Sequence, residues 1–202
     1  NKNIMENLKL HAEKLLREFK NENYIFGLNC TSSAGSLAKR LGKRAILVIS
    51  SGNWALSFKE QIIKSLKEHK ISVLETADSS KPNSPKQDLY NLQDIIAAKR
   101  PDFLIAAGGG STIDLVKAAS VLVSLSAGIH NIEPYFGTGN VSEKLKAFKK
   151  KLMPVFAIQM SASSAAHLTK YSNITDEETL QKKLIVDDAI IPPVALFDYS
   201  CT

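Results

Sequence analysis

Three consecutive glycines mark the part of the sequence with the clearest chemistry. The apolar run 103–107 is followed directly by Gly108, Gly109, Gly110 and Ser111, and then by a helical pattern. Glycine has no Cβ, so a ligand can lie against the main chain, and the first amides of a helix carry about half a positive charge. These residue types favour a binding site for pyrophosphate. A tight turn that binds nothing explains the glycines equally well.

Ser111 and Asp114 stand three residues apart, which is the spacing of a capping box. In that motif the hydroxyl caps the helix and the acidic side chain reaches back to its first turn. The pair therefore either caps the helix alone or also supports an anion site. The stretch is neither GxGxxG nor GxxxxGK, because no lysine follows the last glycine directly. An ordinary nucleoside triphosphatase is disfavoured.

The elements around this turn alternate between strands and helices. Because strands separated by helices cannot pair as hairpins, we predict an α/β fold, a Rossmann-like parallel sheet with helices on both faces. Residues 170–187 instead indicate a small β-hairpin with a polar tip. We assign 1–22 to a helical extension and 23–202 to a dinucleotide-binding α/β domain. The predicted strands are 23–26, 45–50, 71–74, 103–107, 154–159 and 194–197, and the predicted helices include 4–20, 33–41, 54–69 and 111–125.

Composition excludes several classes of function. The chain has 202 residues, of which 44% are hydrophobic and 23% charged, and a net charge of +6, which is modest for a nucleic-acid binder. The lysines within 144–151 indicate a solvated helix face, so we expect no nucleic-acid partner. The apolar stretch 118–129 is shorter than the roughly 20 residues of a membrane helix, so we expect no membrane partner. Cys30 and Cys201 lack CxxC spacing, which favours a reducing, cytoplasmic location.

Four segments resemble one known family. Residues 108–117, GGGSTIDLVK, are similar to the GGGSxxDxxK stretch of the iron-containing (group III) alcohol dehydrogenases. Residues 173–178 with the KK pair after them, and 191–198, resemble that family's ITDEE, KK and IPxxAxxD segments, and 42–49 resembles its opening strand. The matches occur in the family's order. Glycerol dehydrogenases and dehydroquinate synthases share the fold, but the ITDEE hairpin favours the alcohol dehydrogenase branch.

The resemblance implies that the chain is the N-terminal half of such an enzyme, a dehydroquinate synthase-like domain. It implies NAD or NADP as cofactor and a small alcohol or aldehyde as substrate. In the family a helical C-terminal domain, absent from this chain, holds the catalytic Fe²⁺ or Zn²⁺. The four histidines show no HxxxH spacing, so we expect no metal site here and no turnover by this chain alone. The alternative is a catalytically inactive nucleotide-binding or scaffolding module of the same fold.

The same resemblance implies positions for the cofactor contacts. The glycine turn and Ser111 would contact the pyrophosphate, with Asp114 and Lys117 supporting the helix start. Ser161 and Ser164 would lie in a second nucleotide-contacting turn. Lys182 would approach the ribose near the nicotinamide, although a solvated charge explains it as well. The cofactor-binding residues expected from these arguments are Ser51, Gly108, Gly109, Gly110, Ser111, Asp114, Ser161, Ser164 and Lys182.

The sequence also departs from the family pattern. The family turn PTTAGT is replaced by QMSASS at 159–164, which keeps two hydroxyls but loses the proline and the glycine. His167 stands where the family usually has Glu, and we interpret it as a histidine on a helix surface. Residues 51–53 contain no carboxylate to repel a 2′-phosphate, which leaves room for NADP. Strand 23–26 is a candidate edge for a homodimer.

Overall fold

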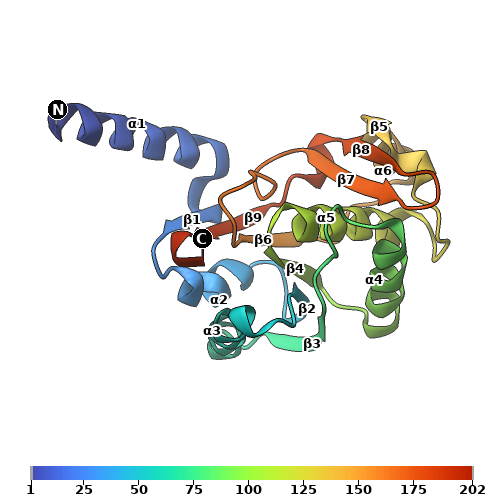
Figure 1. The fold of residues 1–202 in the computed structure, drawn as a ribbon, viewed down its shortest axis with the longest axis horizontal. Coiled ribbons are helices and arrows are strands. Elements are labelled where there is room, and N and C mark those ends of the chain that lie inside the picture. The colour runs from blue at the N-terminus through green and yellow to red at the C-terminus, as the bar shows by residue number, and fades with distance from the viewer. Residues whose placement is uncertain (1, 202) are drawn as a thin grey trace.

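The centre of the molecule is a six-stranded, wholly parallel sheet with the strand order β1-β9-β6-β4-β2-β3 (Figure 1). The structure is a computed structural model that describes residues 2–201, except for the side chain of Lys2. The predicted fold class is confirmed. The strands of the large sheet are β1 Tyr24–Gly27, β2 Arg44–Ile49, β3 Ser72–Ala77, β4 Phe103–Gly108, β6 Val155–Gln159 and β9 Val194–Asp198.

Helices cover both faces of this sheet because side chains alternate between the faces along each strand. Ala45, Leu47 and Ile49 of β2 pack towards α2 and α3, whereas Ile46 and Val48 pack towards α4 and α5. The helix predicted for 33–41 is shorter, since α2 ends at Ala38. The helices are α1 Lys2–Lys20, α2 Ala34–Ala38, α3 Leu56–Glu68, α4 Lys86–Lys99, α5 Gly110–Leu125 and α6 Asn140–Phe148.

A second, three-stranded sheet contains the predicted hairpin. β7 Tyr171–Asp176 and β8 Gln181–Val186 pair antiparallel, which confirms the hairpin, and β5 Gly137–Thr138 adds a short parallel strand that the sequence did not indicate. The hairpin lies across α5 (Figure 1), and Ser172 of β7 donates a hydrogen bond to the Asp114 carbonyl oxygen at 2.7 Å. This small sheet therefore packs on the helix that follows the glycine turn.

Helix α1 projects away from the sheet (Figure 1), and its apolar side chains Ile4, Leu8 and Phe19 are exposed. At its end the Lys20 ammonium group donates to the Pro192 carbonyl oxygen, and burial lowers the pKa of Lys20 to about 8.

Strand β1 lies at the edge of the large sheet, as expected. The homodimer through this strand stays a prediction. The division into a helical extension and a dinucleotide-binding domain also stays a prediction. Within residues 2–201, no helix has both the length and the hydropathy needed to cross a bilayer.

Asp198 ties the end of β9 to the loop that follows β1. Its buried carboxylate accepts hydrogen bonds from the Asn29 amide at 2.9 Å, and from the amide and hydroxyl of Thr31 at 2.8 and 2.7 Å. Ser200 donates to the same carboxylate. Burial alone raises the pKa of Asp198, but the hydrogen bonds from Ser200 and Thr31 outweigh it and lower the pKa to about 2.

Replacing Asp198 with Asn is expected to lower the free energy of unfolding by about 2 kcal/mol at pH 7, because charge-assisted hydrogen bonds are lost. The carboxylate's contribution is complete above its ordinary pKa of 3.8 and is lost as the pH falls towards the folded-state pKa of about 2. Urea denaturation of both proteins between pH 7 and pH 2 measures this. A difference that stays constant over that range would contradict the assignment.

Candidate dinucleotide-binding site

The three glycines at 108–110, from the end of β4 to the start of α5, do not adopt an unusual backbone, since none of them has a positive φ. A Cβ on Gly108 would lie 2.8 Å from Thr112 Oγ1, and one on Gly110 would lie 3.0 Å from Ser164 Oγ. A Cβ on Gly109 would meet nothing nearer than the Ser161 Cβ at 3.7 Å, an ordinary contact. A Cβ at position 108 would therefore overlap Thr112 and one at position 110 would crowd Ser164, whereas the main chain at Gly109 stays open to a ligand.

The predicted capping box at the start of α5 is wrong. The helix begins at Gly110, and no side chain caps it, so Ser111 lies inside its first turn. The Ser111 hydroxyl accepts instead from the Asn83 amide at 3.2 Å. The Asp114 carboxylate accepts from the amide and the side-chain nitrogen of Asn173, both at 3.1 Å. The first amides of α5 are thus left without a side-chain cap, which suits an anion.

Two buried charges on α5 hold the hairpin and do not reach the glycine turn. Burial raises the pKa of Asp114, although the hydrogen bonds from Asn173 and the charge of Lys117 oppose it. The Lys117 ammonium group donates to the carbonyl oxygens of Thr169 at 2.7 Å and Tyr171 at 3.0 Å, and burial lowers its pKa to about 8. Lys117 therefore supports the segment before β7 and not the helix start.

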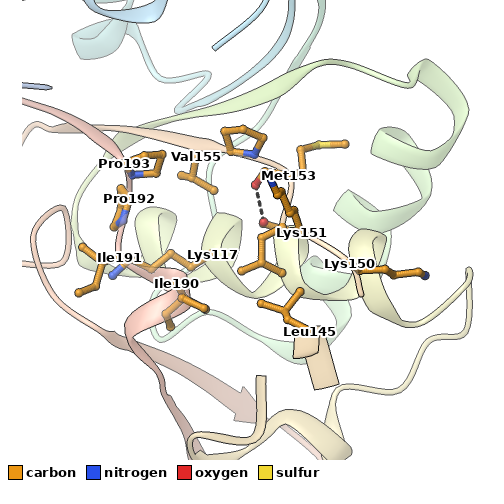
Figure 2. A pocket seen from close by; sticks show the side chains of 14 residues that line it. Lys117, Leu145, Lys150, Lys151, Met153, Val155, Ile190, Ile191, Pro192 and Pro193 are labelled. Atoms are coloured by element: carbon orange, nitrogen blue, oxygen red, sulfur yellow. Dashed lines mark hydrogen bonds between the residues drawn. The ribbon is translucent and has the colours of Figure 1, made fainter. Parts of the chain in front are cut away.

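Lys117 also lines a separate pocket of about 310 Å³. Figure 2 shows its side chain beside Ile190 and Ile191, close to Pro192. This pocket lies at the amino ends of β6 and β9, because Val155 opens β6 and Pro193 precedes β9. The glycine turn follows the carboxyl end of β4. The pocket and the glycine turn are thus at opposite ends of the parallel sheet.

The loop after β6 packs directly against the glycine turn. Gly108 is paired in register with Gln159, and the Met160 amide donates to the Gly108 carbonyl oxygen at 2.9 Å. Ser161 then lies over Gly109 and Ser164 over Gly110. A Cβ on Gly109 would be 3.7 Å from Ser161 Cβ, and one on Gly110 would be 3.0 Å from Ser164 Oγ. The structure therefore brings together both predicted turns. Their contact with a cofactor stays a prediction.

His167 is not on a helix surface, so that expectation is wrong. It lies in an irregular segment after the loop, with only 3% of its surface exposed. Its ring nitrogens face Gln159 Oε1 and the Tyr24 hydroxyl, each at 3.1 Å. Burial, followed by the charge of Lys117, lowers the pKa of His167 to about 4, so the imidazole is neutral at pH 7. The segment packs His167 against Tyr24 of β1 and Phe197 of β9, contacts that its local sequence pattern did not indicate.

A carboxylate does lie beside Ser51, although the sequence around Ser51 contains none. Asp78, directly after β3, accepts hydrogen bonds from the Ser51 amide at 2.9 Å and the Ser51 hydroxyl at 3.0 Å. Partial burial raises the pKa of Asp78, but the hydrogen bonds from Ser51 outweigh it and the pKa is lowered overall. Because β2 and β3 are parallel neighbours, the loops at their carboxyl ends meet. A carboxylate from the next strand therefore stands beside Ser51, and the choice between NAD and NADP stays a prediction.

The hairpin reaches the site through Asn83, a residue that sequence reasoning missed. Asn83 has a φ of +67° in the loop before α4, and its carbonyl oxygen accepts from the Thr175 hydroxyl at 2.7 Å. The Lys182 ammonium lies 3.5 Å from Asn83 Oδ1. Lys182 is thus at the rim of the site, two contacts from Ser111. The only sequence signal for Asn83 was a loop rich in proline and small polar residues.

A family model described as iron-containing alcohol dehydrogenase matches residues 21–199. The chain belongs to the iron-containing alcohol dehydrogenase family. The NAD-dependent methanol dehydrogenase of Bacillus methanolicus is 26% identical to it over 175 residues, 86% of this chain and 43% of that enzyme. The NADPH-dependent butanol dehydrogenase of Clostridium saccharobutylicum is 28% identical over 159 residues, 78% of this chain and 39% of that enzyme.

Solved structures of alcohol dehydrogenases have the same fold. The alcohol dehydrogenase from Oenococcus oeni matches this chain with a TM-score of 0.74 at 25% identity, covering 88% of this chain and 44% of the other. This member of the family spans less than half the length of the relatives it matches.

Residues 2–201 of this chain contain no group of three or more His, Cys, Asp or Glu side chains placed to hold a metal ion. They therefore do not provide the metal site that the family name implies.

The different demands on the glycines are testable by stability. Gly108→Ala is expected to lower the free energy of unfolding by about 2 kcal/mol, because its Cβ would overlap Thr112. Gly109→Ala is expected to change it by less than about 0.5 kcal/mol, because its Cβ makes an ordinary contact. Urea denaturation of the two variants compares them. Equal losses would mean that Gly109 is also required by packing.

Proposed function

We propose that this chain is the NAD(P)-binding portion of an alcohol dehydrogenase. It holds the dinucleotide so that the nicotinamide exchanges a hydride with a small alcohol or aldehyde. The observation that carries the proposal is the open main chain at Gly109, at the uncapped start of α5. Membership of the iron-containing alcohol dehydrogenase family supports it, as do relatives named for NAD and for NADPH.

The residues around the turn suit the parts of a dinucleotide. The amides at Gly109, Gly110 and Ser111 would bind the pyrophosphate, because they lie where the helix dipole favours an anion. The hydroxyls of Ser161 and Ser164 would donate to the same phosphates from the facing loop. The remaining members of the site are Gly108, which permits the turn; Asp114, which fixes the hairpin to α5; Lys182, which would approach the ribose near the nicotinamide; and Ser51, on the adenosine side.

The chain's own share of the reaction is to bind and orient the cofactor. The described residues do not fit the Fe²⁺ or Zn²⁺ that the resemblance implies, so no step through a metal is assigned to them. We therefore propose that the 202-residue chain binds dinucleotide without turning over an alcohol. A cytoplasmic location stays a prediction from the cysteine usage; Cys30 and Cys201 are both free thiols.

Gly109→Val tests the proposed site. The valine side chain would stand where the pyrophosphate lies, so affinity for NAD⁺ is expected to fall by about tenfold or more. Isothermal titration calorimetry of the wild type and the variant measures this, and urea denaturation checks that both are folded. Equal affinities in two folded proteins would remove the glycine turn as the binding site.

Asp78 favours NAD over NADP in this proposal. Its carboxylate is ionised and held beside Ser51, at the carboxyl ends of β2 and β3. A carboxylate at this end of a parallel sheet accepts hydrogen bonds from the adenosine ribose and repels a 2′-phosphate. The two cofactors occur in the names of relatives at similar identity, so family membership does not decide between them. We therefore propose NAD because the chain's own Asp78 carboxylate lies beside Ser51.

Replacing Asp78 with Ser is expected to improve the affinity for NADP⁺ relative to NAD⁺ by about tenfold, because a like charge is removed from the 2′-phosphate. Titrating each cofactor against wild type and variant gives the ratio. Asp88→Ser is the control, because it removes a nearby carboxylate that bonds to the Lys81 amide instead of Ser51. An unchanged ratio in Asp78→Ser would place the ribose elsewhere.

A further inference from the structure

A chain of hydrogen bonds runs from the edge of the large sheet to the loop that faces the glycine turn. Gln159, the last residue of β6, is fully buried, and its Nε2 donates to the Ser161 carbonyl oxygen at 2.5 Å and to the Ser164 hydroxyl at 3.4 Å. Its Oε1 lies 3.1 Å from His167 Nδ1. On the other side of the ring, His167 Nε2 lies 3.1 Å from the Tyr24 hydroxyl of β1.

These hydrogen bonds can run in one direction only. A carbonyl oxygen accepts and never donates, so the Gln159 amide nitrogen must face Ser161 and the amide oxygen must face His167. His167 therefore carries its proton on Nδ1, and its Nε2 accepts from the Tyr24 hydroxyl. The imidazole thus sets the orientation of the Gln159 amide, and that amide holds the loop.

The surroundings of His167 keep the ring in the neutral form that this arrangement needs. Burial, followed by the charges of Lys117 on α5 and Lys20 at the end of α1, lowers the pKa of His167 to about 4. The rings of Tyr24 and Phe197 pack beside it with centroids 5.5 Å away. A protonated ring would donate from both nitrogens and would not accept from Tyr24.

Gln159 and His167 lie on either side of the segment that contains Ser161 and Ser164. These two residues are eight positions apart in sequence and in direct contact in the structure. Their contact therefore joins the two ends of the segment that carries both serines.

We propose that Gln159 and His167 are positioning residues, which hold the Ser161–Ser164 loop against the glycine turn in the form that binds the dinucleotide's phosphates. Ser161 Cβ would be 3.7 Å from a Cβ on Gly109, and Ser164 Oγ would be 3.0 Å from one on Gly110, so the loop packs directly over these two glycines. The inference rests on the proposed function. It adds that the loop's shape depends on a buried amide and an imidazole that touch no ligand themselves.

Binding of ADP, a diphosphate probe, to the full chain tests the proposal. Gln159→Leu is expected to weaken ADP binding by about tenfold, because the loop loses the bonds that hold it. His167→Phe keeps an aromatic ring for packing and is expected to weaken binding similarly. The double variant is expected to bind no more weakly than Gln159→Leu alone, because His167 acts through Gln159. Additive losses would overturn the proposal.

Gln93→Leu is the matched control. Gln93 of α4 is another buried glutamine, and its amide donates at 3.0 Å to the hydroxyl of Ser126, at the end of α5 opposite the glycine turn. It is expected to leave ADP affinity within about twofold. Adenosine, which lacks phosphates, is the ligand control. If Gln93→Leu weakens ADP as much as Gln159→Leu, or if adenosine and ADP are weakened equally by Gln159→Leu, the role is merely structural and the proposal fails.

Nuclear magnetic resonance of the ligand-free chain separates this proposal from the proposed function. The His167 ring is expected to show a proton on Nδ1, and His167→Phe is expected to shift the Ser161 and Ser164 amide signals as Gln159→Leu does. A proton on Nε2, or unmoved amide signals, would overturn the positioning role. If the wild type binds no ADP while these signals are as expected, the proposed function fails, but the positioning of the Ser161–Ser164 loop by Gln159 and His167 is still supported.

Discussion

The close contact between the turn after β4 and the loop after β6 is the constraint on which the candidate site depends. β4 and β6 are parallel neighbours, so their carboxyl ends emerge side by side. Without a Cβ at 108 and 110, Thr112 and Ser164 take positions that a Cβ would overlap at 108 and crowd at 110. The loops therefore meet around Gly109, where the main chain remains accessible beside the uncapped start of α5.

Buried polar groups away from the turn keep this contact in place. Asp114 and Lys117 fix the hairpin and the residues just before it to α5. Both side chains are buried away from water, and they bind main-chain groups instead: the Asn173 amide for Asp114, and the Thr169 and Tyr171 carbonyl oxygens for Lys117. Gln159 donates to the Ser161 carbonyl oxygen of the loop, and His167 contacts the Gln159 amide oxygen. The charged and polar residues of the sequence motif thus divide into groups that face the site and groups that support the elements around it, a division that spacing does not show.

Predictions from the sequence were strongest where the signal is local. The alternation of apolar runs and helical patterns correctly indicated a parallel sheet covered on both faces, and the polar tip correctly indicated the β7–β8 hairpin. Predictions that required knowing what lies opposite a residue were weaker. Ser111 and Asp114 had capping-box spacing, but α5 begins one residue earlier, and their partners became Asn83 from the loop before α4 and Asn173 from strand β7.

The sequence by itself determined the family, the sheet and the place of the glycine turn, because these follow from residue types at short spacing along the chain. Tertiary structure alone decided that Asp78 stands beside Ser51 and that His167 is buried against Gln159 and Tyr24. Each of these contacts joins different strands or loops of the sheet. The order and register of strands, which no local pattern encodes, bring them together.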